Sequence, residues 1–215
     1  MSVLVYAIAQ RGDSAVGGHG FQHQPLRGIR SDALMAIVSD HEGAALRPEV
    51  ETLWDYERIV ERIAQAHAIV PVRFGSVMDD DEAVVEMLRS RREHLLTVLE
   101  YTRGAVELAV RATWEQAPEP EHQTGTGYMR ARLQLRSRAR EVAGDLMPLG
   151  KLSRTSRCEL PAGPEQPMRC AYLVDRELVE DFTTSLRRLD QQLRDLELVC
   201  TGPWPPYSFA EAVLP

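Results

Sequence analysis

Apolar residues that return every three or four positions give the clearest structural signal in this chain, near its C-terminal end. Such a stripe is typical of an amphipathic helix that packs one face against a core. The positions that form it are Leu178, Phe182, Leu186, Leu189, Leu193 and Leu196. We therefore predict a helix over this segment, with its apolar side buried.

Three earlier segments show the same periodicity less regularly. Pro48 is expected to open a helix that ends near His67, because Pro often stands in the first helical turn. The acidic run at 79–82 predicts the start of a long helix that ends near Gly104, because carboxylates favour helix N-termini. A further helix is expected over 128–149.

The apolar stripes of these helices are expected to face a core. In the helix that Pro48 opens, the stripe consists of Val50, Leu53, Trp54, Val60, Ile63 and Ala64. In the helix that follows the acidic run, it consists of Val84, Leu88, Leu95 and Leu99, at intervals of four, seven and four. This second spacing fits either ordinary core packing or a short coiled-coil seam in a dimer.

Short runs of apolar and β-branched residues predict the strands. They are 3–8, 34–38 and 68–70 in the first half, and 105–114, 152–160, 168–174 and 196–200 in the second. With its helices, the second half has the order β-α-β-β-α-β of a ferredoxin-like domain. We therefore expect an α+β protein with two small domains, residues 1–104 and 105–200, followed by a tail rich in Pro and aromatic residues, 201–215.

Composition excludes several classes of protein. The 215 residues are 44% hydrophobic and 27% charged, which is ordinary for a globular chain. No run approaches the roughly 18 apolar residues of a membrane span. The formal net charge is −7, from 25 basic and 32 acidic residues, which disfavours a phosphate-coating surface. We therefore expect neither a membrane nor a nucleic acid as partner.

The cysteines predict a reducing compartment. There are three, Cys158, Cys170 and Cys200, an odd count with no C-x-x-C spacing. Cys158 and Cys170 lie on strands expected to be adjacent, where cysteine usually packs as a small apolar residue. The first residues also lack the basic start and long apolar run of a signal peptide. We expect free thiols and a cytoplasmic protein.

No group of residues in the sequence assembles a catalytic or metal centre. His19 and His23 lie in a glycine-rich loop with no third ligand nearby, and the run 79–82 lacks the spacing of a calcium loop. Five arginines between 130 and 140 are expected to form a solvated helix face. Glu107 lies within a strand, as either a buried or a solvent-facing acid. We therefore expect no enzyme, no metal and no cofactor.

Two segments are less easily explained as ordinary packing. In Pro71-Val72-Arg73-Phe74-Gly75-Ser76-Val77, a strand is interrupted by Pro and closed by Gly. It is either an edge strand that turns into the next helix or a contact surface. In Gly202-Pro203-Trp204-Pro205-Pro206-Tyr207-Ser208-Phe209, prolines stiffen a backbone that carries three aromatic side chains. It is either a tail packed on its own domain or a docking strip for a partner.

These two segments resemble the P-V-R-F-G-T-V and G-P-W-P-P-Y-S-F signatures of the gas-vesicle protein F/L family. The opening Val5 to Ile8 is similar in place and order, as is the stretch from Gly104 to Leu108 that includes Glu107. The resemblance therefore spans nearly the whole chain. Ser76 stands where threonine is usual in the family. The compact length favours the F type.

The resemblance implies an accessory or minor structural protein of gas-vesicle assembly, not an enzyme. It implies a modified ferredoxin-like N-terminal domain and a C-terminal α+β domain. Its partners would be the small, very hydrophobic major shell protein or other accessory proteins of the vesicle. The residues of its motifs and contacts would be Pro71, Arg73, Phe74, Gly75, Glu107, Gly202, Pro203, Trp204, Pro205, Pro206, Tyr207 and Phe209.

The residues themselves leave two other functions open. Pairs of ferredoxin-like domains often bind a ligand between them, so one alternative is a regulatory protein that binds a small molecule. The other is a hydrolase or transferase that uses Glu107 or Cys158, which would need a site without a recognisable motif.

Overall fold

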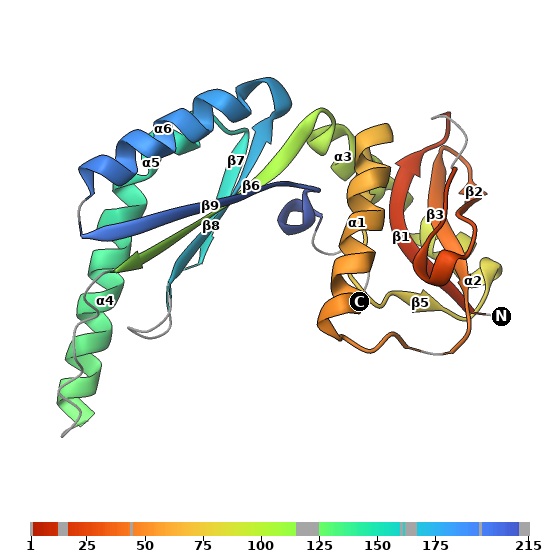
Figure 1. Cartoon of the computed structure of the whole chain (residues 1–215), viewed down its shortest axis with the longest axis horizontal. Helices are drawn as coiled ribbons and strands as arrows, with labels where there is room; N and C mark the ends of the chain where they lie inside the picture. Colours follow the sequence, from red (N-terminus) through yellow and green to blue (C-terminus); the bar gives the residue numbers. More distant parts are fainter. Residues whose placement is uncertain are drawn as a thin grey trace. The chain divides into compact units, whose positions relative to one another are not determined.

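The computed structural model describes residues 2–12, 17–43, 45–114, 125–159, 161, 167–193 and 195–210. They belong to two units, of which the second is Ala105–Trp204. The first comprises the chain up to Gly104 together with the segment from Pro205 onward. Each unit contains one antiparallel sheet, its helices and its own apolar core (Figure 1).

The sheet of the first unit has the order β2-β3-β1-β4, and β5 also pairs with β1. Its strands are β1 (Ser2–Gln10), β2 (Arg27–Ser31), β3 (Leu34–His41), β4 (Ile69–Pro71) and β5 (Val77–Met78). Helices cover both faces, which is why β1 and β3 are apolar at nearly every position instead of at alternate ones. A register shift between Val5 and Ala7 changes the alternation, so that Val5 and Ile8 contribute to the same core.

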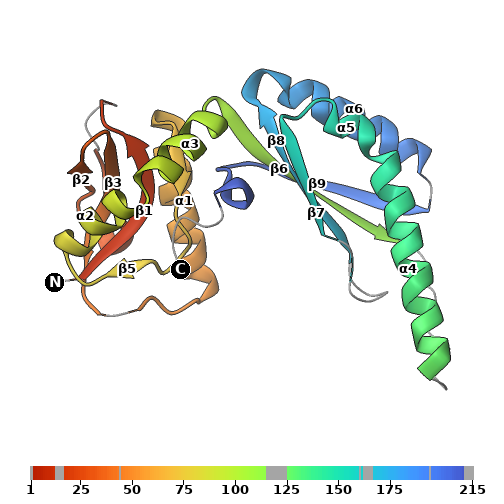
Figure 2. The same ribbon diagram turned by 180° about the vertical axis from the view of Figure 1, so that it is seen from behind.

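One face of this sheet packs against α1 (Val50–Ala66), and the other against α2 (Asp81–Ser90) and α3 (Arg92–Thr102), as Figures 1 and 2 show from opposite sides. The single long helix expected up to Gly104 is wrong, because the backbone leaves the helical conformation at Arg91. The expected stripe from Val84 to Leu99 is buried in the core of its own unit. It is therefore ordinary core and not a dimer seam.

The second unit confirms the ferredoxin-like order, since its sheet runs β7-β8-β6-β9. Its strands are β6 (Ala105–Trp114), β7 (Thr155–Glu159), β8 (Met168–Asp175) and β9 (Leu196–Trp204). Helices α4 (Gly125–Asp145), α5 (Met147–Gly150) and α6 (Val179–Gln192) supply the rest of the core on one face (Figure 1). Among the described residues, no helix has the length and apolar character needed to cross a membrane.

Strand β9 is longer than the sequence predicts. It was expected to end at Cys200, but it continues through Gly202 and Pro203 to Trp204. The expected tail is therefore divided: its first residues complete the second sheet, and the residues from Pro205 pack in the first unit as the short helix η3 (Tyr207–Phe209). The chain makes this change where a Pro-Pro pair excludes further ladder hydrogen bonds.

The expectation of free thiols is wrong for two of the three cysteines. Cys158 of β7 and Cys170 of β8 stand directly opposite each other in the antiparallel ladder and form a disulfide. Their separation of 12 residues gave no sign of this, because the strand register and not the spacing brings the two side chains together. The expected cytoplasmic compartment therefore loses the support of reduced thiols. Cys200 is free, and burial raises the pKa of its thiol.

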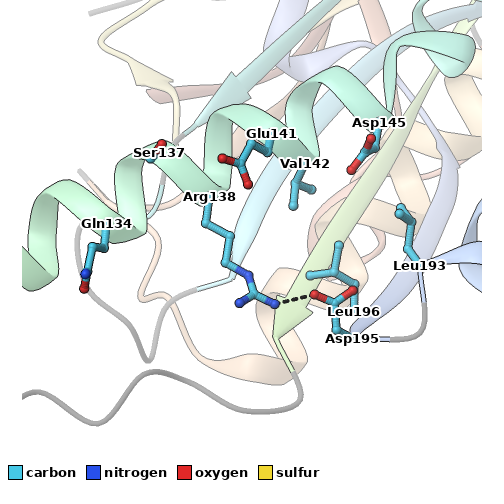
Figure 3. A pocket seen from close by; sticks show the side chains of 9 residues that line it. All are labelled: Gln134, Ser137, Arg138, Glu141, Val142, Asp145, Leu193, Asp195 and Leu196. Carbon is cyan, nitrogen blue, oxygen red and sulfur yellow. Dashed lines mark hydrogen bonds and ion pairs between the residues drawn. The ribbon is translucent and has the colours of Figure 1, made fainter.

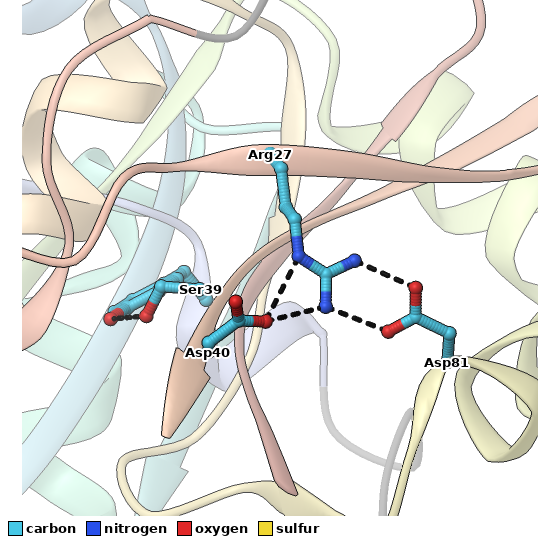
Figure 4. A network of polar contacts seen from close by, with 5 residues as sticks. Arg27, Ser39, Asp40 and Asp81 are labelled. Carbon is cyan, nitrogen blue, oxygen red and sulfur yellow. Dashed lines mark hydrogen bonds and ion pairs between the residues drawn. The ribbon is translucent and has the colours of Figure 1, made fainter. Parts of the chain in front are cut away.

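An arginine on β2 connects three elements of the first unit. The Arg27 guanidinium donates to Asp40 of β3 and to both carboxylate oxygens of Asp81, at 2.7 to 3.1 Å (Figure 4). Asp80 caps α2 by accepting from the Ala83 amide at 2.8 Å. The acidic run at 79–82 is therefore a helix start with an ion-pair network, as its charge predicts.

Arg27→Met is expected to lower the free energy of unfolding of the first unit by about 1 kcal/mol at neutral pH. The effect is small because the three side chains are 36 to 54% exposed and water screens them. Arg27 lowers the pKa of Asp81, so the ion pair stabilises the fold above the unfolded pKa of about 4 and its contribution is lost as the pH falls through the folded value. Urea unfolding at pH 7 and pH 3 checks this, and an equal difference at both would contradict it.

Candidate protein-interaction site on helix α1

A buried tyrosine on α1 is the centre of the polar contacts in the first unit. The Tyr56 hydroxyl lies 2.9 Å from the carbonyl oxygens of Val5 and Val72 and 3.2 Å from that of Arg73. Its ring stacks on Tyr6, with the centroids 5.3 Å apart. Burial raises the pKa of Tyr56 well above its ordinary value, so the hydroxyl stays protonated and donates. Tyr56 therefore fixes α1 to the end of β4.

The Pro71–Gly75 motif is the segment that this tyrosine holds. Pro71 ends β4, and Arg73 is exposed while its carbonyl accepts from Ser76 Oγ at 2.8 Å. Phe74 lies edge-on to Tyr56, with the ring centroids 5.4 Å apart. Gly75 has a φ of +79°, a conformation in which glycine carries no steric strain. The motif is therefore an edge strand that turns sharply toward α2, and its aromatic side chain supports α1.

The C-terminal motif is divided between two roles. Gly202 and Pro203 are exposed and Trp204 is half-buried at the end of β9. Pro205, Pro206 and Phe209 are buried in the first unit, and a buried side chain does not contact a partner. The docking strip expected over residues 202–209 is therefore not a continuous exposed surface.

Tyr207 joins this second part of the motif to α1. It packs against the same core as Tyr56 and Phe74, and it lies beside Glu57. Burial raises the pKa of Glu57, and the neighbouring Tyr207 side chain opposes that rise. The two motifs, far apart in the sequence, thus meet at one helix.

Glu107 lies elsewhere, in β6 opposite Trp204 of β9. It is 7% exposed, so the buried alternative is the correct one. Its neighbour Leu108 belongs to the core of the second unit. Glu107 therefore points to the other face of the sheet. Among the described residues, no group of three His, Cys, Asp or Glu side chains is arranged to hold a metal ion.

The outward side of α1 differs from its prediction. Val50, Leu53 and Trp54 are 69, 36 and 58% exposed, although all three were expected in the core. The helix begins at Val50, two residues after Pro48, and its buried side is formed by Tyr56, Ile59, Val60 and Ile63. We name Val50, Leu53 and Trp54 the α1 patch. Exposed apolar groups of this kind mark sites of protein contact.

A hollow of about 430 Å³ lies in the second unit (Figure 3). Its apolar base includes Val142, Leu193 and Leu196, and Glu141, Asp145 and Asp195 lie around it. Arg138 of α4 forms an ion pair with Asp195 within it. None of the residues expected in contacts or motifs lines this hollow.

Sequence reasoning missed Tyr56 and the exposure of the α1 patch. Tyr56 gave no signal, because a tyrosine between two acidic-rich turns of a helix has no motif of its own. The exposure of the α1 patch gave no signal either, because Val50, Leu53 and Trp54 continue the apolar stripe of the helix in the sequence.

Comparisons with known proteins identify the family of this chain. Residues 2–211 match the family model "Gas vesicle synthesis protein GvpL/GvpF". The chain is similar to gas vesicle protein F of Streptomyces sp. (strain CB03234), at 30% identity over 98% of this chain and 100% of that protein. It is also similar to gas vesicle protein L of the same organism, at 28% identity over 96% and 91% of the two chains.

Solved structures show the same fold. The crystal structure of GvpF from Anabaena sp. superposes with a TM-score of 0.82 at 20% identity, covering 98% of this chain and 96% of that one. GvpF from Microcystis aeruginosa gives 0.81 at 16% identity, with 98% and 99% covered. Because the family model and the Streptomyces relative both span nearly the whole chain, the protein belongs to the gas vesicle protein F/L family.

Proposed function

We propose that this protein acts in gas-vesicle assembly by binding the major shell protein, as an accessory or minor structural component and not as an enzyme. Membership of a gas-vesicle synthesis family supports the process. The exposed α1 patch is the observation that carries the binding role. A small, very hydrophobic shell protein needs an apolar partner before it is built into the wall, and an exposed tryptophan on a helix is a typical anchor for one.

The arrangement of the motifs supports the choice of α1. Tyr56, Phe74 and Tyr207 hold the buried side of this helix through hydrogen bonds and ring packing. A rigid helix presents its exposed side chains with little loss of entropy on binding. Parts of the two family motifs thus support α1 on the side opposite to the α1 patch.

Leu53→Ala with Trp54→Ala is expected to abolish retention of the shell protein. The test is co-expression of the tagged chain with the major shell protein, followed by purification in detergent-free buffer. Truncating a central aromatic anchor typically weakens binding by about 2 kcal/mol or more, roughly thirtyfold. Co-purification of the shell protein by the wild type and its absence from the double variant is the expected result.

Met147→Ala is the matched control. Met147 is 63% exposed on α5, so the change removes a comparable apolar side chain without touching the α1 patch. Shell protein should still be retained. Equal retention by the Leu53/Trp54 variant would contradict the role of the α1 patch, and no retention by the wild type would contradict direct binding and favour contacts with other accessory proteins of the vesicle.

A further inference from the structure

Large exposed apolar side chains gather on two helices of the described chain. Five of the seven such residues lie on α1 and α4: the α1 patch, and Met129 and Leu133, which are 57 and 63% exposed. The buried residues of α4 are Leu135, Ala139 and Val142, all in its C-terminal half. The N-terminal half of the helix extends away from the sheet (Figure 1, Figure 2). Each helix therefore has an apolar outer side that its own unit leaves uncovered.

The two outer sides have the same spacing and opposite charge. On α1 the residues at successive steps of four, three and four are Val50, Trp54, Glu57 and Glu61, here named the α1 row. On α4 the same steps give Met129, Leu133, Arg136 and Arg140, here named the α4 row. Steps of four and three are the spacing with which two helices pack along a common seam. Both rows begin with two apolar residues, after which one continues with glutamates and the other with arginines.

Within the part of the chain that the structure describes, several charges next to these rows have partners outside them. Arg58 of α1 pairs with Asp55, and Arg62 donates to the His19 carbonyl. Arg138 of α4 forms an ion pair with Asp195, and Arg138 points into the hollow and lies outside the α4 row (Figure 3). Arg136 and Arg140 are both exposed. Glu57 is half-buried beside Tyr207, so the charges left to face solvent or a partner are Glu61 on the α1 row and Arg136 and Arg140 on the α4 row.

From this match we infer that α1 of one copy packs in parallel against α4 of a second copy. In the parallel direction Val50 and Trp54 meet Met129 and Leu133, and Glu61 meets Arg140. The antiparallel direction would place charges against apolar side chains, which is unfavourable. The contact joins two different surfaces of the chain, so association either closes into a ring of copies or continues head to tail.

This self-association affects how the α1 patch is used. A second copy covers the α1 patch when no shell protein is bound, and a shell protein that binds to the patch displaces the second copy. The contact itself does not depend on the proposed function, because it involves this chain alone. A small interface with exposed ion pairs is weak and sensitive to salt.

Sedimentation velocity of the full chain over a range of concentrations tests the inference. The average mass of the wild type should rise with concentration, and the rise should shrink in high salt. Glu61→Arg and Arg140→Glu should each reduce the association constant by about tenfold or more, because each places like charges across the seam. The chain that carries both changes should regain association, since its rows are again complementary.

Controls separate the two rows from general charge effects. Glu51→Arg and Arg130→Glu make the same charge changes on exposed positions outside the rows and should associate like the wild type. Trp54→Ala and Leu133→Ala provide a second pair of disruptive variants, and circular dichroism shows that each is folded. A wild type that stays monomeric at every concentration overturns the inference, as does a double charge variant that fails to regain association. Normal self-association without shell-protein retention would contradict the proposed function alone.

Discussion

Tyr56→Ala is expected to lower the free energy of unfolding of the first unit by about 4 kcal/mol, the typical result of removing a large aromatic side chain from a core. Tyr56 has no exposed surface, and its ring contacts those of Tyr6 and Phe74. The cavity would loosen α1 from the sheet. Hydrogen exchange of the β1 and β4 amides measures the loss in this unit alone, because the second unit has its own core.

Tyr56→Phe separates the hydroxyl from the ring. It keeps the packing but leaves the carbonyls of Val5, Val72 and Arg73 without the donor that they share. Unsatisfied buried acceptors cost about 1 to 3 kcal/mol, so the phenylalanine variant should lie between the wild type and the alanine variant. Protection of the β1 amides equal to that of the wild type in both variants would show that Tyr56 does not hold α1 in place.

Gly202→Ala is expected to destabilise the second unit by about 3 kcal/mol. Gly202 has a φ of +113°, and a side-chain carbon there would lie 2.7 Å from the carbonyl oxygen of Glu107. A conformation of this kind costs a residue other than glycine about 1 to 2 kcal/mol, and the clash with the backbone adds to it. Because β6 and β9 meet at this point, the pairing of their ends should be lost first.

Gly144→Ala is the control for this change. Gly144 lies within α4 with no atom near the position of an added carbon, so alanine should stabilise the helix by about 0.5 to 1 kcal/mol. Two measurements compare the variants: thermal unfolding of each chain, and hydrogen exchange of the β6 and β9 amides. Equal stability of both would contradict the role of Gly202 as the residue that permits close approach to Glu107.

Much of the fold could be predicted from the sequence because its signals are local. The β-α-β-β-α-β order of the second unit follows from alternating runs and stripes that each element carries by itself. The break at Arg91 could not be predicted in the same way. The apolar stripe continues across it, since both α2 and α3 lie on the same core, so its period does not reveal a change in helix direction.

Features that depend on register or on distant packing were outside the reach of the sequence. The disulfide depends on which residue of β8 faces Cys158. The tail divides because Pro205 and Phe209 are buried in the first unit, more than a hundred residues away along the chain. The candidate site was predicted in part. Residues 71–75 and 205–209 of the motifs lie in the first unit and support α1 from its buried side, whereas residues 202–204 belong to the second unit. The exposed α1 patch had been expected in the core.

The order in which the two units use the chain has a consequence during protein synthesis. The segment that completes the first unit, with Tyr207 and Phe209, is made only after the whole of Ala105–Trp204 has been synthesised. Until then the place of Tyr207 beside Tyr56 and Phe74 is empty, and α1 lacks part of its support. A chain interrupted anywhere in the second unit therefore lacks part of the support of α1.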